Sequence, residues 1–85
     1  MAFQLNISRA AQKVLAGIAQ RDRRRIYERL DQLAADPYAM PNVKKLQGED
    51  LYRLRVGDYR VLYFIEDDQL LIVIVEIGHR REVYR

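Results

Sequence analysis

Residues 51–65 decide the fold, and they read LYRLRVGDYRVLYFI. The side chains on either side of Gly57-Asp58 suit β-strands, and a two-residue connection of this kind is typical of a β-hairpin turn. A turn of fixed length also fixes which residues face each other across the two strands. The predicted pairs are Val56 with Tyr59 and Arg55 with Arg60. We therefore predict two antiparallel strands joined by a tight turn.

Downstream of this hairpin, residues 70–77 predict a third antiparallel strand, which follows a polar turn at residues 66–69. The strand is apolar at nearly every position, as is typical of a central strand that is covered on both faces. We expect the chain to leave the sheet at Gly78, with the tail of residues 79–85 following directly.

Upstream of the hairpin, the spacing of apolar residues changes from that of a strand to that of a helix. Residues 3–7 alternate apolar and polar side chains, and Ser8 follows where a helix N-cap would lie. One helix is expected up to about residue 20, and a second from an N-cap at Asp22 to Asp36-Pro37, where proline disfavours continuation. Residues 37–42 are then expected to form a loop that returns to the sheet. This loop ends at the basic pair Lys44-Lys45.

This order of elements predicts an α+β fold. We expect the N-terminal strand to join a twisted, mainly antiparallel sheet, with the two-helix hairpin packed on one face of that sheet. With 85 residues, the chain is expected to form a single domain over residues 1–85, because neither half could bury a core of its own.

Composition excludes several classes of protein. The chain has no cysteine, which removes disulfides, thiolate metal sites and a cysteine nucleophile. The longest apolar run, residues 70–75, is far shorter than the roughly 18 residues of a membrane-spanning helix, and residues 1–4 lack the pattern of a signal peptide. We therefore expect a cytoplasmic protein with no membrane partner.

The positive charge of the chain is carried mostly by arginine, which supplies twelve of the fifteen basic residues at a formal net charge of +3. The guanidinium group suits phosphate, although a GC-rich genome would produce the same bias. In the predicted hairpin Arg55 lies opposite Arg60, with Arg53 on the same face. Like charges directly opposite destabilise a sheet by about 0.2 to 1 kcal/mol, so the arrangement predicts an anion site. The alternative is a solvated face whose arginines lean apart into water.

The tail holds the remaining candidates for chemistry. His79 is the only histidine and a candidate general acid or base, although a lone histidine is more often a surface residue. In an extended tail Arg80 and Tyr84 share one parity, which would let both face the Arg55–Arg60 pair; alternatively, Tyr84 covers the edge of the core.

A single histidine, no cysteine and acids that suit a turn favour chemistry without a metal or another cofactor. Attack by the 2′-hydroxyl of RNA on its own phosphate fits these side chains. Arginines would neutralise the charge on phosphorus, and Tyr84 or His79 would accept the proton.

Four segments together resemble the RelE family of bacterial and archaeal toxins. These segments are KLQG at 45–48, LYRLR at 51–55, GDYRVLY at 57–63 and GHRREVY at 78–84. The resemblance spans the whole chain, and the combination of the hairpin with the terminal segment is its most specific part. It implies a ribosome-dependent mRNA endoribonuclease that cleaves codons in the A site. It also implies a type II toxin–antitoxin module, in which a cognate antitoxin forms a hetero-oligomer with the toxin.

The resemblance assigns roles by position. Arg60 and Arg80 would stabilise the phosphate, with Arg80 also assisting the leaving group, and Tyr84 would orient or activate the attacking hydroxyl. Arg53 and Arg55 stand where well-studied members carry lysines, which keeps the charge but leaves the general base unassigned. The residues expected to bind RNA are Lys44, Lys45, Arg53, Arg55 and Arg81. The basic run Arg21, Arg23, Arg24 and Arg25 would contact ribosomal RNA or, alternatively, is a solvated helix end.

Two other functions stay open on the sequence alone. The same scaffold hosts ParE-type inhibitors of DNA gyrase, which generally do not keep Arg60, Arg80 and Tyr84 together. The basic face would also suit a non-catalytic RNA-binding module, which would bind RNA with a strong salt dependence and leave it uncut.

Overall fold

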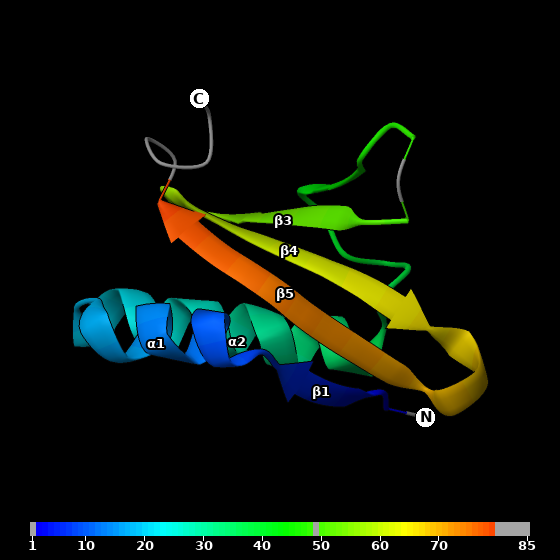
Figure 1. Cartoon of the computed structure of the whole chain (residues 1–85), viewed down its shortest axis with the longest axis horizontal. Coiled ribbons are helices and arrows are strands. Elements are labelled where there is room, and N and C mark those ends of the chain that lie inside the picture. Colours follow the sequence, from blue (N-terminus) through cyan, green and yellow to red (C-terminus); the bar gives the residue numbers. More distant parts are fainter. Residues whose placement is uncertain (1, 49, 80–85) are drawn as a thin grey trace.

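The computed structural model describes residues 2–48 and 50–79, which form an α+β fold of the predicted kind (Figure 1). Its elements are β1 (Gln4–Ile7), α1 (Arg9–Gly17), α2 (Gln20–Ala35), β2 (Val43–Lys45), β3 (Tyr52–Val56), β4 (Tyr59–Glu66), a 3-10 turn (Asp67–Gln69) and β5 (Leu71–His79). The strands form one sheet in the order β1-β5-β4-β3-β2. Only the β1–β5 pair is parallel; the other neighbouring strands of this sheet run antiparallel.

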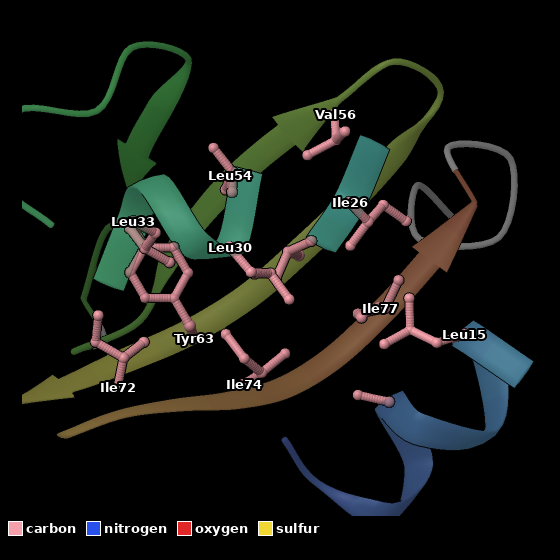
Figure 2. Packing of buried hydrophobic residues seen from close by; sticks show 12 residues of the cluster. Leu15, Ile26, Leu30, Leu33, Leu54, Val56, Tyr63, Ile72, Ile74 and Ile77 are labelled. Carbon is pink, nitrogen blue, oxygen red and sulfur yellow. The ribbon is translucent and has the colours of Figure 1, made fainter. Parts of the chain in front are cut away.

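The hydrophobic core lies between the sheet and the two helices, which cover the same face of it (Figure 2). Its buried members are Ala11 and Leu15 of α1, Ile26, Leu30 and Leu33 of α2, and Leu54, Val56, Val61, Tyr63, Ile72, Ile74 and Ile77 of the strands. Burial of each large side chain contributes about 1.5 to 3 kcal/mol, so this single layer of contacts dominates the stability. Within residues 2–48 and 50–79, no helix covers the opposite face of the sheet.

The two helices begin differently from each other. Ser8 caps α1 as predicted, because its side chain accepts a hydrogen bond from the Ala11 amide at 3.1 Å. The predicted cap at Asp22 is wrong, since α2 starts at Gln20 with Ala19 in the cap position. Asp22 lies in the first turn instead, where its negative charge interacts favourably with the helix dipole.

The sheet differs from the prediction at three points. β2 pairs with β3 where only a loop was expected, because three residues are too few to show a period in the sequence. Gly78 does not end β5, which continues to His79 with Gly78 opposite Arg60. β5 is central as predicted, but its cover on the face away from the core is uneven, since Gly78 is buried there whereas Val75 is 36% exposed.

No helix within residues 2–48 and 50–79 combines the length and the apolar character that crossing a bilayer requires.

Candidate functional site

The β3–β4 hairpin has the predicted register. Val56 lies opposite Tyr59 and Arg55 opposite Arg60, and the turn between them uses Gly57 at a φ of 59°. On its other side Arg60 pairs with Gly78 of β5, which presents no side chain. The two arginines are therefore adjacent across the strands, and the residue on the other side of Arg60 adds no side chain.

Four basic residues share the face of the sheet that lacks helices. Leu54 and Val56 are buried against the helices, so alternation along β3 directs Arg53 and Arg55 to the opposite face. Cross-strand pairing adds Arg60 from β4 and Lys44, which lies opposite Arg53, from β2. We call Lys44, Arg53, Arg55 and Arg60 the cationic face.

Exposure differs strongly within the cationic face. Lys44 and Arg55 are exposed and Arg53 is half-buried, but Arg60 is only 3% exposed. Removing a guanidinium from water costs free energy that other groups must offset, and the charge of Arg60 is less screened by solvent than the charges of its neighbours. A charge in this setting interacts more strongly with an anion than an exposed charge does.

The cationic face is bounded by an acid that the sequence did not reveal. Glu76 of β5 lies opposite Leu62, the next residue of β4 after Arg60 to face the same side. The pairing shifts by one residue between Leu62 and Tyr63, and this bulge reverses the alternation of β5 after Ile74. An uninterrupted alternation would have directed Glu76 into the core, so the sequence offered no signal for this neighbour.

His79 lies on the other side of the sheet from Arg60. It pairs with Tyr59, and their rings meet edge to face with centroids 5.3 Å apart. Both rings line a hollow of about 200 Å³ together with Asp22 and Arg25 of α2. The structure therefore does not bring His79 together with the cationic face.

Lys45 is also separated from the cationic face, since alternation along β2 turns it away from Lys44. It lines a hollow of about 630 Å³ whose other residues include Tyr38, Tyr52 and the acids Asp50, Glu66, Asp67 and Asp68. Tyr38 donates a hydrogen bond to Asp67, and this bond raises the pKa of Tyr38 to about 12. The surroundings of Lys45 are thus acidic, unlike those of Lys44.

The remaining predicted site residues, Arg80, Arg81 and Tyr84, lie outside the described residues. Within the described part of the chain, no three histidine, aspartate or glutamate side chains gather into a possible metal site.

Comparison with known proteins identifies the family. The family model for the ParE toxin of the type II toxin–antitoxin system parDE matches residues 5–84. The chain belongs to the RelE/ParE family of toxins. Among curated proteins, this toxin is 28% identical over 88 residues to the putative toxin RelE1 of Methanocaldococcus jannaschii, a match that covers 100% of this chain and 98% of that protein.

Solved structures give the same result for the toxin. It superposes on the archaeal RelE–RelB complex from Pyrococcus horikoshii with a TM-score of 0.84 and 33% identity, covering 94% of this chain and 97% of that one. The toxin–antitoxin complex RelBE2 from Mycobacterium tuberculosis matches with a TM-score of 0.82 and 25% identity, covering 94% and 93%. Both relatives were crystallised as complexes with their antitoxin partners.

Proposed function

We propose that this toxin is a ribosome-dependent mRNA endoribonuclease. The observation that carries the proposal is the cationic face, where Arg55 and Arg60 lie opposite each other on the side of the sheet away from the helices. A fold selected for stability alone has no use for like charges in directly opposed positions. An anion between them converts this repulsion into attraction, and a phosphate of RNA is such an anion.

The proposed reaction uses the 2′-hydroxyl of the nucleotide before the cleaved bond. Its oxygen attacks the adjacent phosphorus, the bond from phosphorus to the 5′-oxygen breaks, and a 2′,3′-cyclic phosphate and a 5′-hydroxyl result. Arg60 and Arg55 would neutralise the charge that develops on the phosphorane oxygens, since arginine keeps its charge throughout. Arg53 and Lys44 would hold the neighbouring phosphates.

The proton of the attacking hydroxyl needs an acceptor, and the leaving 5′-oxygen needs a nearby cation to stabilise its negative charge until it takes up a proton from water. His79 faces the helix side with Tyr59, which argues against a role beside Arg60. We therefore assign the acceptor role to Tyr84, and the charge-stabilising and leaving-group role to Arg80. Arg81 would contact the RNA backbone, and Lys45, among acids, is a weaker candidate for RNA binding than Lys44.

The proposed module includes an antitoxin that restrains the toxin in the cytoplasm by forming a hetero-oligomer with it. Support comes from the two relatives that were crystallised with antitoxin partners. An antitoxin that covered the cationic face would exclude RNA from it directly.

Cleavage during translation tests the proposal. The purified toxin is added to a cell-free translation reaction, and the 5′ ends of the messenger are mapped by primer extension. We expect new ends within A-site codons for the wild type and for Lys13→Gln, an exposed residue of α1. Arg60→Gln, Arg80→Ala and Tyr84→Phe should lose these ends while remaining folded. An intact messenger with folded wild-type protein would refute the nuclease assignment.

Inhibition of DNA gyrase is the second candidate, because the matching family model is that of the ParE toxin. A supercoiling assay separates the two functions. Inhibited supercoiling together with an intact messenger would establish the gyrase inhibitor. Salt-dependent RNA binding with neither effect would establish a non-catalytic RNA-binding module.

A further inference from the structure

The basic run at the start of α2 divides into two surfaces. Arg21 and Arg25 line the hollow next to the β3–β4 turn, together with His79. Arg23 and Arg24 line a different, shallow hollow of about 280 Å³ with Gln20 and Tyr27. The four residues of this second hollow, positions 20, 23, 24 and 27, are spaced i, i+3, i+4 and i+7, so their side chains cover one strip of the helix surface. We call Gln20, Arg23, Arg24 and Tyr27 the Tyr27 site.

The Tyr27 site combines an exposed ring with two cations. Tyr27 is 43% exposed, whereas Ile26 next to it is fully buried in the core. No acidic side chain lines the hollow, and within the described residues neither Arg23 nor Arg24 forms an ion pair. Glu28 stands at i+4 from Arg24, a spacing that allows helical ion pairs, yet the two are not paired within the 4.0 Å that such contacts require.

We infer that the Tyr27 site binds an unpaired nucleotide of RNA, with the base stacked on Tyr27 and the flanking phosphates held by Arg23 and Arg24. An exposed aromatic ring offers a base a flat apolar surface, and single-stranded RNA is recognised by stacking of this kind. Two guanidiniums without acidic partners attract a polyanion, and the ligand that supplies both a base and phosphates is a nucleic acid.

The Tyr27 site and the cationic face are on different sides of the sheet. α2 covers the face that holds the core (Figure 1), and the alternation along β3 places the cationic face on the other side. One short RNA segment therefore does not occupy both sites. The inference rests on the proposed function for its ligand class, and it adds a second RNA segment that the toxin holds away from the bond it cleaves.

Fluorescence of a base analogue tests the stacking. The probe is a short uridine-rich RNA that carries one 2-aminopurine, whose emission is quenched when the base stacks on a ring. The titrations use full-length toxin with Arg55→Gln, which weakens binding at the cationic face. In this background Tyr27→Ala should remove the quenching and weaken binding by roughly 5- to 100-fold, as stacking on an aromatic residue gives. Tyr27→Phe keeps the aromatic ring, so it should keep both the quenching and the affinity for RNA.

The arginines have a different expected signature. Arg23→Gln and Arg24→Gln should leave the quenching at saturation unchanged and each lower the slope of log K against log salt by about 0.7. Tyr38→Ala is the matched control, since Tyr38 is 63% exposed but lies among acids, and it should bind RNA like its parent. Thermal unfolding verifies that each variant is folded.

Unchanged quenching and affinity in folded Tyr27→Ala would overturn the inference. So would a Tyr27→Ala variant that binds RNA normally but loses affinity for the antitoxin, because the strip would then be a protein interface. These outcomes are independent of cleavage in the translation assay. A toxin that cleaves messenger without stacking at Tyr27 refutes this inference alone, and stacking without cleavage refutes only the proposed function.

Discussion

Replacing Arg55 by glutamine should make the toxin more stable and less active. Arg55 lies directly opposite Arg60, and like charges in this position cost about 0.2 to 1 kcal/mol. Arg55 is exposed, so solvent screens part of the repulsion, whereas the burial of Arg60 strengthens it. We therefore expect the free energy of unfolding to rise by about 0.5 kcal/mol, within the range that cross-strand pairs show.

Urea unfolding at two salt concentrations measures this gain. At about 0.1 M salt, where the Debye length is about 10 Å, the unfolding midpoint should shift upwards for Arg55→Gln. At about 1 M salt, where the Debye length is about 3 Å, this shift should shrink. Lys13→Gln, an exposed substitution on α1, controls for the loss of one positive charge. A less stable Arg55→Gln, or a gain that does not depend on salt, would refute the electrostatic account. If Arg55 is retained for function at the expense of stability, Arg55→Gln should be more stable than the wild type and should cleave less messenger.

Three further substitutions test individual contacts. Burial raises the pKa of Tyr63, whose hydroxyl has no hydrogen-bond partner among the described residues. Tyr63→Phe should therefore raise the free energy of unfolding, measured by urea titration, by about 1 kcal/mol. A lower free energy of unfolding would show that the hydroxyl has a partner. The hydrogen bond to Asp67 raises the pKa of Tyr38 to about 12. The stabilisation of the fold by this bond should be complete below a pH of about 10, which is the pKa of an ordinary tyrosine. It should be lost as the pH rises through the raised pKa. Tyrosinate absorbance of wild type minus Tyr38→Phe checks this, and a titration near the ordinary value would contradict it. Ser8→Ala removes the cap of α1 and the 2.7 Å hydrogen bond that the Ser8 hydroxyl donates to the Val75 carbonyl. It should lower the midpoint of thermal unfolding by the equivalent of about 1 kcal/mol. An unchanged midpoint would disprove the stabilising role of the cap.

The local pattern of the sequence predicted the parts of the fold that depend on near neighbours. The Gly57-Asp58 turn joins adjacent strands, so its length alone determined that Arg55 faces Arg60. Ser8 was predictable for the same reason, because a cap and its helix are contiguous. The cationic face follows from these local rules, with the addition of Lys44 through a strand that the sequence did not reveal.

Contacts between distant segments were not predictable. The bulge opposite Leu62 changes which side of β5 faces the helices, and it brings Glu76 to the boundary of the cationic face. His79 was expected in a tail near the arginines, but the register carries β5 past Gly78 and pairs His79 with Tyr59 on the helix side. Both results depend on how β4 and β5 fit together along their full length, which no short window of sequence encodes.

The parallel pairing of β1 with β5 also sets an order of events during synthesis. β1 is made first, yet its partners run from Leu71, opposite Gln4, to Ile74, opposite Ile7. The nascent chain therefore cannot complete its sheet until almost all of the described residues have left the ribosome, since loop closure over so long a separation has to wait for its second end. Until β5 is available to pair with β1, the chain has no finished sheet on which to display the charges of the cationic face.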